Sequence, residues 1–416
     1  MADDLKKMYK TIVDEHFPPR MEISFIDETS RQTLFFEKVL WDIQGEQKGL
    51  RYGENPGQEA ALFKLVNGNL IFGETRTIQP GRYLASDIEL LQSGKHPGKT
   101  NVTDADNALN ILRYFMDTPT AVIVKHNNPC GVAQSDVLAD AYHKAMMADR
   151  VAAFGGCIAV NRPVDKATAE AIGNQYAEVV VAPEFEDGVM AIFSAKKNLR
   201  VVRIQNIARL QDFVGQRFVD FKSLMDGGLV AQWSFVPQAR TKADLKLAAC
   251  DCKGKTYIIQ REPTEKEYQD MLFGWLVEAG ITSNSVIYVK DRVTVGIGTG
   301  EQDRVGVAEI ARDKAYRKLA DRYCFETLGM AYNDLKDSEK KADIDRRVAA
   351  QNGGLKGSAM VSDAFFPFRD GIDVGLNEKV SCVIQPGGSD NDYQSIEACN
   401  EVGATMVYTG QRSFKH

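Results

Sequence analysis

The sequence has no long hydrophobic run, and its cysteines do not form a pattern typical of disulfides. No stretch of about 18 apolar residues occurs in the 416 residues, so no membrane-spanning helix is expected. The opening residues, MADDLKKMYK, are charged and contain no apolar segment of the kind that a secretory signal requires. The seven cysteines are scattered and odd in number, so we expect free thiols and a reducing, cytoplasmic location.

Excess positive charge and metal-binding motifs are also missing. The net charge of -6 argues against a broad nucleic-acid surface, which needs clustered basic residues. Cys250 and Cys252 have no second ligand pair, and the Pro129-Cys130 dipeptide has neither a following cysteine at position 133 nor a preceding H-x-E, so no zinc site is expected. No Walker A motif is present, which leaves ATP-driven chemistry without support.

The sequence does contain the alternation of strands and helices that is typical of α/β proteins. Apolar residues make up 44% of the chain, enough for a large core. Short apolar runs typical of buried strands alternate with helical patterns, which predicts α/β layers with helices on both sheet faces. Strands are expected at 121–124, 179–182, 286–289, 293–297, 382–385 and 406–408. Helices are expected at 2–15, 104–115, 264–280 and 392–402, and 325–355 resembles a charged insertion.

The segment Lys125-His126-Asn127-Asn128-Pro129 follows one of the predicted buried strands and should form a loop. Of the five histidines, only His126 directly follows a strand predicted to be buried. Its imidazole could act as a general base, and Lys125 could stabilise negative charge that develops on an oxygen. The residues alone also allow a histidine that hydrogen bonds merely hold in a turn.

Three further segments could bind a ligand or could be ordinary structure. Arg51 beside Tyr52 suits bidentate capture of phosphate or carboxylate, unless it lies in a surface turn. The phenylalanines of 362–370 could pack in the core or line an aromatic ligand, and Asp370 could accept a hydrogen bond or carry a proton. The backbone of 386–389 could present N–H groups to an anion ahead of a helix, or simply turn.

The glycines at 296–300 do not form a dinucleotide fingerprint, because they follow a predicted hairpin and depart from GxGxxG. We expect this glycine-rich turn to place Arg304 instead.

Ten segments, in matching order from residue 21 to residue 416, resemble the AICAR transformylase family. They are RYGENP, VKHNNPCGVA, AAFGG, EVVVAP, AKKN, SNSVIY, VGIGTGEQDR, SDAFFPFRDGID, IQPGGS and TGQRSFKH. The resemblance implies a tandem of cytidine-deaminase-like three-layer α/β units without zinc. It implies formyl transfer from 10-formyltetrahydrofolate to the 5-amino group of AICAR (5-aminoimidazole-4-carboxamide ribonucleotide), giving formyl-AICAR and tetrahydrofolate in purine (IMP) biosynthesis.

The resemblance also implies a domain organisation and a homodimer with active sites between its subunits. We expect an N-terminal helix at 1–20, a first subdomain at 21–235 on which 325–355 packs, and a second subdomain at 236–416.

The matching motifs carry the family's functional residues onto this chain. By resemblance, His126 is the proton acceptor, Lys125 stabilises the transition state and Asn284 contacts the transferring group, with Asp370 as a fourth catalytic residue. The residues expected to contact AICAR are Arg51, Tyr52, Asn101, Gly155, Glu178, Phe365 and Arg412. The residues expected to contact folate are Arg304, Val305, Ser389 and Asp390.

The chain also departs from the family pattern. Only a short segment precedes residue 21, so we expect a stand-alone transformylase whose downstream partner is a separate IMP cyclohydrolase. Gly57 stands where the family pattern has histidine. Some members bind potassium, and the sequence does not identify its ligands here. Formylation of another amine and non-catalytic AICAR binding remain the alternative functions.

Overall fold

The computed structural model describes residues 15–43, 45–56, 58–77 and 79–416, and its contacts divide the chain into two compact units. Unit 1 comprises Met1–Pro119, Val124–Asn127 and Gly155–Val236. Unit 2 comprises Thr120–Ile123, Asn128–Phe154 and Pro237–His416. The helix expected at 2–15 and Gly57 lie outside the described residues, apart from residue 15, which is not helical.

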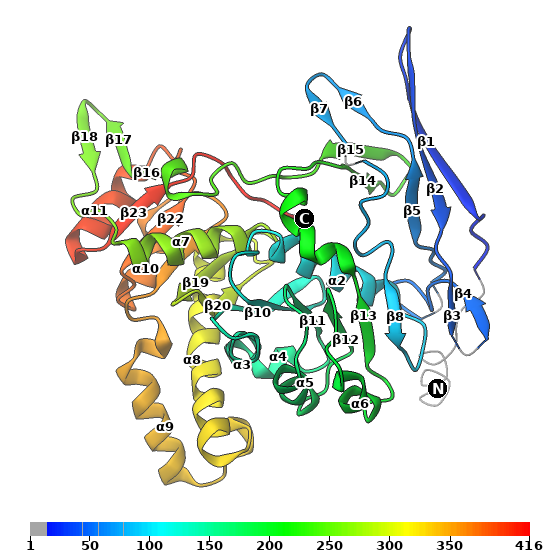
Figure 1. Cartoon of the computed structure of the whole chain (residues 1–416). Coiled ribbons are helices and arrows are strands. Elements are labelled where there is room, and N and C mark those ends of the chain that lie inside the picture. Colours follow the sequence, from blue (N-terminus) through cyan, green and yellow to red (C-terminus); the bar gives the residue numbers. More distant parts are fainter. Residues whose placement is uncertain (1–14, 44, 57, 78) are drawn as a thin grey trace. The chain divides into compact units, whose positions relative to one another are not determined.

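The core of unit 1 is a sheet with three parallel strands, β11 (Cys157–Val160), β12 (Val179–Ala182) and β13 (Arg200–Arg203). Strand β8 (Glu89–Gln92) pairs antiparallel with β13 (Figure 1). All residues of β11 and β12 are buried, as expected for strands covered on both faces. Four helical segments lie in the described part of this unit: α2 (Lys99–Leu112), α5 (Lys166–Gly173), α6 (Val189–Ser194) and the 3-10 helix η1 (Gln205–Phe213).

The rest of unit 1 is built from small antiparallel sheets, whose strands come from both ends of the unit's sequence. Its strands are β1 (Arg20–Ile26), β2 (Arg31–Lys38), β3 (Trp41–Ile43), β4 (Glu46–Lys48), β5 (Phe63–Asn67), β6 (Ile71–Phe72), β7 (Thr75–Arg76), β14 (Val219–Ser223) and β15 (Leu229–Trp233). A small core of Trp41, Leu50, Ala85 and Val102 joins this region to α2. This packing fixes the backbone immediately before Arg51.

Unit 2 contains a larger mixed sheet. Its strands follow the order β16 (Lys246–Leu247), β23 (Thr405–Tyr408), β22 (Cys382–Gln385), β21 (Ala359–Ser362), β19 (Val286–Lys290), β20 (Val293–Gly298) and β10 (Asn128–Gln134). Strands β21, β22 and β23 are parallel, whereas β16 pairs antiparallel with β23 at the edge. Strand β9 (Thr120–Lys125) is shared, because its first four residues belong to unit 2 and its last two to unit 1.

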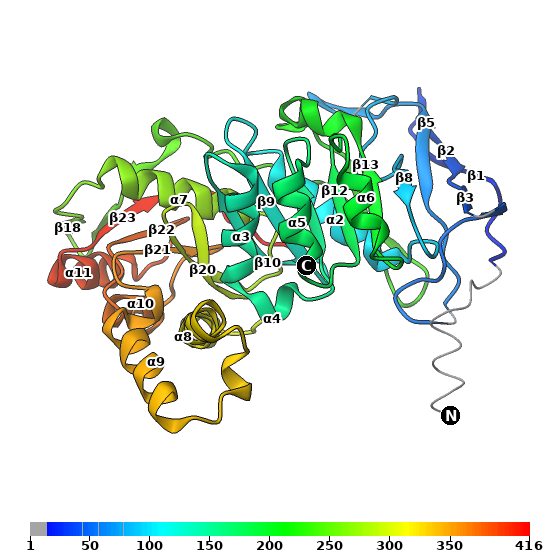
Figure 2. The same cartoon turned by 60° about the horizontal axis from the view of Figure 1, so that its bottom comes forward.

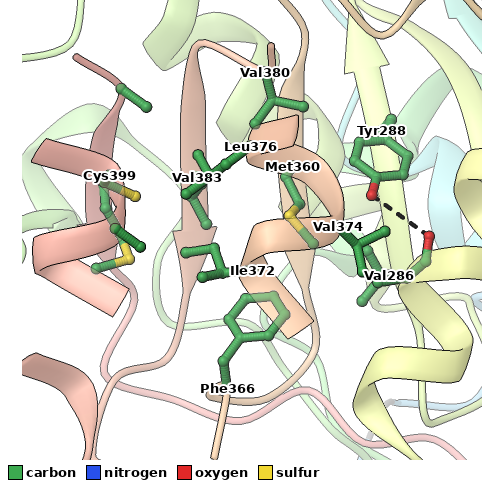
Figure 3. Packing of buried hydrophobic residues seen from close by; sticks show 14 of the residues in the cluster. Val286, Tyr288, Met360, Phe366, Ile372, Val374, Leu376, Val380, Val383 and Cys399 are labelled. Atoms are coloured by element: carbon green, nitrogen blue, oxygen red, sulfur yellow. Dashed lines mark hydrogen bonds between the residues drawn. The ribbon is translucent and has the colours of Figure 1, made fainter. Parts of the chain in front are cut away.

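The helices in the described part of unit 2 are α3 (Leu138–Ala148), α4 (Arg150–Ala153), α7 (Glu265–Glu278), α8 (Arg304–Leu328), α9 (Ser338–Ala350), α10 (Arg369–Asn377) and α11 (Asp392–Val402). Residues of α8, α10 and α11 pack against the sheet in a large apolar core. Figure 3 shows Phe366, Ile372 and Val374 packed near Met360 and Val383 of the sheet. Short elements complete the unit: η2 (Lys242–Asp244), β17 (Ala249–Cys252), β18 (Lys255–Ile258), η3 (Tyr332–Asp334) and η4 (Asn352–Gly354).

The charged segment 325–355 forms the end of α8, then η3, α9 and η4. Helix α9 runs back alongside α8 and buries Ile344 and Val348 against Ala320 and Cys324 (Figures 1 and 2). The segment therefore packs on unit 2. The expected division into subdomains at 235/236 stays a prediction, although the compact units do change at Val236/Pro237 and residues 128–154 group with unit 2.

The two units repeat one order of elements. In each unit an antiparallel edge strand, β8 or β16, precedes a long helix, α2 or α7, and three parallel strands come later. The predicted α/β class is confirmed, while the likeness to cytidine deaminases stays a prediction.

Most predicted elements are present, but several boundaries differ from the prediction, including the end of α2, which is at Leu112 rather than at 115. Helix α2 begins at Lys99 rather than at 104, because the Asn101 side chain accepts a hydrogen bond from the Gly98 N–H (3.0 Å) and caps the helix. The predicted loop at 125–129 consists only of His126 and Asn127, since β10 already begins at Asn128. Among the described helices, none combines the length and hydropathy needed to cross a membrane.

Candidate active site

The predicted site residues divide between the two units, and we call the two sets the unit 1 cluster and the unit 2 cluster. The unit 1 cluster contains Arg51, Tyr52, Asn101, Lys125, His126, Gly155 and Glu178. The unit 2 cluster contains Asn284, Arg304, Val305, Phe365, Asp370, Ser389, Asp390 and Arg412.

Lys125 is the last residue of β9, and the turn that follows, made of His126 and Asn127, has an uncommon backbone conformation. His126 and Asn127 have φ angles of 55° and 61°, in the left-handed region that costs non-glycine residues roughly 1–3 kcal/mol each. Two hydrogen bonds to the Asp104 carboxylate hold the turn: His126 N to Oδ2 at 3.3 Å and Asn127 N to Oδ1 at 2.7 Å. Asn107 Nδ2 also donates to the Asn127 carbonyl oxygen (2.9 Å). The turn thus presents an exposed imidazole on a fixed backbone.

Arg51 and Tyr52 form a buried pair rather than a surface turn. Arg51 is 8% exposed, and its Nη2 donates to the Tyr52 hydroxyl oxygen at 3.0 Å. The guanidinium carbon also lies 4.6 Å from the centroid of the Tyr52 ring. Backbone bonds fix both residues against the start of α2, from Arg51 N to the Pro97 carbonyl and from Lys99 N to the Tyr52 carbonyl. This arrangement can hold a cation ready for an anionic ligand.

Asn101 connects the start of α2 with Glu178, which directly precedes β12. Its Nδ2 donates to Glu178 Oε2 at 2.9 Å. Gly155 lies close by, and its N–H donates to the Tyr176 carbonyl (2.8 Å). Gly155 has a φ of 78°, and a Cβ there would come within 3.3 Å of the Tyr176 ring and 4.0 Å of Lys125 Nζ. A glycine is therefore required beside the Lys125 amine.

Three residues that the motif analysis missed shape the electrostatics of the unit 1 cluster. Burial, followed by the nearby Arg51 charge, lowers the pKa of Arg200, which is 5% exposed. Burial raises the pKa of Asp104, and it raises the pKa of Cys157 well above its ordinary value. Cys157 therefore stays a neutral thiol. The guanidinium groups of Arg51 and Arg200 lie close enough to interact with each other, and Arg200 also interacts with Glu178.

In unit 2, Arg304 orients Asn284 and is itself locked by Asp363. Arg304 Nη2 donates to Asn284 Oδ1 at 3.0 Å, and Asn284 Nδ2 donates to the Gln302 carbonyl at 2.9 Å. Arg304 Nη1 forms an ion pair with Asp363, whose carboxylate is fully buried. We predicted a ligand contact for Arg304, and the structure shows a guanidinium already engaged with protein acceptors.

Asp363 is the residue that sequence reasoning missed in unit 2. Its Oδ2 accepts from Ser283 Oγ (2.6 Å) and from Ser285 N (3.1 Å), on either side of Asn284. The peptide bond between Ser283 and Asn284 is cis. Asp363 belongs to the SDAFFPFRDGID motif, but its neighbours across the sheet cannot be read from that motif.

The phenylalanine-rich segment divides between core and surface. Phe366 is fully buried in the core, whereas Phe365 and Phe368 are 37% and 60% exposed. Asp370 is also exposed, in the first turn of α10, and its Oδ1 accepts from the Gly371 N–H (2.8 Å). The core interpretation is therefore confirmed for Phe366, whereas a ligand contact at Phe365 stays a prediction.

The backbone N–H groups of 386–389, which were predicted to bind an anion, already donate to a carboxylate of the protein. The N–H groups of Gly388 and Ser389 donate to Asp392 Oδ2, at 2.7 and 3.2 Å. Asp390 is exposed, and so is Arg412, whose guanidinium carbon lies 4.2 Å from the centroid of the Phe414 ring. Val305 is half-buried beside the unit 2 core. Ligand contacts at these positions stay predictions.

A cavity in unit 1 lies away from the predicted residues. It measures about 410 Å³ and is lined by Arg162, Pro163, Pro183 and Glu184, among others. These residues follow the carboxyl ends of β11 and β12, whereas Glu178 precedes the amino end of β12. The cavity is therefore at the opposite end of these strands from Glu178. Across the described part of the chain, no three His, Cys, Asp or Glu side chains are grouped so as to hold a metal ion.

The fold and these motifs define a class of α/β protein, and comparison with known families identifies it. A model of the AICARFT/IMPCHase bienzyme family matches residues 9–314. The chain therefore belongs to this family.

Relatives named "Bifunctional purine biosynthesis protein PurH" support this membership. The relative from Ruegeria sp. (strain TM1040) is 39% identical over 370 residues, covering 88% of this chain and 59% of the relative. The relative from Bacillus subtilis (strain 168) is 35% identical over 389 residues, covering 94% and 61%. The one from Polynucleobacter asymbioticus is 37% identical, covering 92% and 60%. The chain thus spans about 60% of the length of these curated relatives.

Proposed function

We propose that this protein transfers the formyl group of 10-formyltetrahydrofolate to the 5-amino group of AICAR, as a step of purine biosynthesis. The observation that carries the proposal is the Lys125-His126 turn, fixed by Asp104 within the same unit as Arg51, Asn101 and Glu178. Membership of the AICARFT/IMPCHase family supports AICAR and a formyl-folate as the substrates of this site.

The reaction needs orientation of a weak nucleophile, removal of a proton and stabilisation of an oxyanion. The 5-amino nitrogen attacks the formyl carbon and forms the new C–N bond through a tetrahedral oxyanion. His126 accepts the proton from the attacking nitrogen, and Lys125 stabilises the oxyanion. The bond from the formyl carbon to N10 of the folate then breaks, and a proton passes to N10.

Orientation should contribute most to the rate. Holding two reactants in line can supply roughly 7–11 kcal/mol, whereas a general base adds only about 10²–10⁴-fold. In the proposed site, buried Arg51 binds the phosphate of AICAR, and the resemblance to the family adds Arg412 as a second residue that contacts the nucleotide. Asn101, Gly155, Glu178 and Phe365 contact the rest of the nucleotide, and Asn284 contacts the transferring group.

We assign folate to the unit 2 cluster, with contacts from Val305, Ser389, Asp390 and Asp370. Arg304 acts there through Asn284, because its guanidinium already bonds to the Asn284 oxygen. A homodimer with shared active sites, a potassium ion and a cytoplasmic location remain parts of the proposal.

Steady-state kinetics of the purified protein with both substrates tests the proposal. We expect tetrahydrofolate and formyl-AICAR in equal amounts, identified by absorbance and mass spectrometry. AICAR binding without turnover, or formylation of a different amine, would refute it. The relatives are named bifunctional purine biosynthesis proteins, so the same assay should also be analysed for IMP.

A further inference from the structure

The conformation of the catalytic turn is repeated in unit 2, at a place where no catalytic residue is predicted. The β19–β20 hairpin turns through Asp291 and Arg292, whose φ angles are 55° and 56°. Asp270 of α7 accepts from both: Asp291 N to Oδ2 at 3.1 Å and Arg292 N to Oδ1 at 2.7 Å. This geometry matches that of Asp104 with its own turn.

The two turns differ in what their side chains do. The turn in unit 2 has Lys290 Nζ donating to the Lys356 carbonyl (2.8 Å), and Asp291 forms an ion pair with Lys266. The turn in unit 1 instead carries the exposed imidazole of His126, which is the proposed base. The same arrangement, a left-handed turn whose N–H groups donate to a helix aspartate, therefore has a structural role in unit 2 and carries the proposed base in unit 1.

We infer that Asp104 is the positioning residue of the catalytic turn. This inference rests on the proposed function. Asp104 is 8% exposed and accepts hydrogen bonds from the backbone N–H groups of His126 and Asn127, so the carboxylate sets the left-handed backbone from which the imidazole projects. Burial raises the pKa of Asp104, and the N–H donors of Asn127 and His126 act in the opposite direction.

The chain provides a matched control for this inference. Asp104→Asn and Asp270→Asn each replace one acceptor oxygen by an NH₂ group that repels a turn N–H. Both variants should lose similar thermal stability. Asp104→Asn should lower kcat at least about tenfold, because small misplacements of reacting groups cost up to about 100-fold. The KM for AICAR should change little in either variant, and the kcat of Asp270→Asn should stay near the wild-type value.

A second substitution should rescue the turn without restoring the carboxylate. Glycine adopts positive φ at no steric cost, so Asn127→Gly added to Asp104→Asn should recover a substantial part of kcat. Arg292→Gly added to Asp270→Asn should recover stability alone. Equal loss of kcat in Asp104→Asn and Asp270→Asn, or an unchanged kcat in Asp104→Asn, would overturn the inference.

Hydrogen exchange separates this inference from the proposed function. The amides of His126 and Asn127 should exchange slowly in the wild-type protein and much faster in Asp104→Asn. Absence of formyl transfer by the wild-type protein would refute the proposed function only. Unchanged exchange at these two amides in Asp104→Asn would refute the role of Asp104, whatever the activity.

Discussion

His126 combines an exposed imidazole with a backbone that two hydrogen bonds hold in place. Replacing it with alanine removes the base but leaves the Asp104–turn contacts intact. We therefore expect His126→Ala to lower kcat by about 10²–10⁴-fold with nearly unchanged AICAR binding, as measured by steady-state kinetics and calorimetry. His143→Ala, at an exposed position of α3, is the control and should retain wild-type kinetics. An unchanged kcat in His126→Ala would exclude the base assignment.

Arg51 differs from a surface arginine because burial keeps its guanidinium against Tyr52. Arg51→Ala should raise the KM for AICAR strongly, since charge-assisted bonds to a phosphate are lost. Arg113 lies over Tyr114 in a similar way, with 4.9 Å from the guanidinium carbon to the ring centroid, so Arg113→Ala is a matched control. A change in kcat alone in Arg51→Ala would contradict the clamp.

At this scale, motifs predicted residues that lie close in sequence but missed their partners across the fold. Lys125 and His126 are recognisable because they follow an apolar run. Asp104 lies in a helix some twenty positions earlier, and Asp363 lies far from Asn284, so contacts made only by folding bring them to the site. Arg200 begins an ordinary buried strand, and nothing in its local sequence marks it.

At the scale of elements, the close packing of α8 on β20 depends on Gly296, and the local sequence does not reveal this role. A Cβ at Gly296 of β20 would lie 2.3 Å from the Ala311 carbonyl oxygen of α8. Gly296→Ala should therefore destabilise the protein by about 1–3 kcal/mol or more. Gly173→Ala in α5 is the control, because its Cβ would meet only Ile192 at 3.7 Å. Equal midpoints in urea unfolding would contradict this account of α8 packing.

The end of α7 carries a buried carboxyl group that should make stability depend on pH. Burial, followed by the neighbouring Asp363 charge, raises the pKa of Glu278 well above its ordinary value of 4.5. The folded state then binds more protons than the unfolded state, so this stabilising contribution is complete below pH 4.5 and is lost as pH rises through the raised folded value.

Glu278→Gln should remove that dependence and keep an acceptor for Ser285 Oγ. Its stability relative to wild type should grow with pH above 4.5, by up to about 1.4 kcal/mol per pH unit. Thermal unfolding of both proteins across this range measures the effect. Parallel pH profiles would show that Glu278 does not titrate as proposed.

Elements with strong hydrophobic patterns and recognised caps were predicted well, whereas the start of α2 was not. Helix α11 has its predicted ends, and α7 begins at the predicted capping box of Thr264 and Glu267. Helix α2 begins early because the Asn101 side chain caps it, although Thr100, Val102 and Thr103 are weak helix formers.

At the scale of the whole molecule, the two α/β units share one order of elements but carry different sets of site residues. Each unit has three parallel strands and a turn whose backbone N–H groups donate to a helix carboxylate. Local side chains then decide the chemistry: an exposed histidine in unit 1, and the network of Asn284, Arg304 and Asp363 in unit 2. The repeat was invisible as sequence identity because it lies in topology and backbone geometry.

The most direct test of the central claim follows the atoms of the transferred group. The purified protein is incubated with 10-formyltetrahydrofolate labelled with ¹³C in the formyl group and AICAR labelled with ¹⁵N at the 5-amino group, and the product is examined by NMR. We predict a one-bond ¹³C–¹⁵N coupling that appears with the wild-type protein and is nearly abolished by His126→Ala over the same time. Absence of this coupling with the wild-type protein, or its undiminished formation by His126→Ala, would contradict the account.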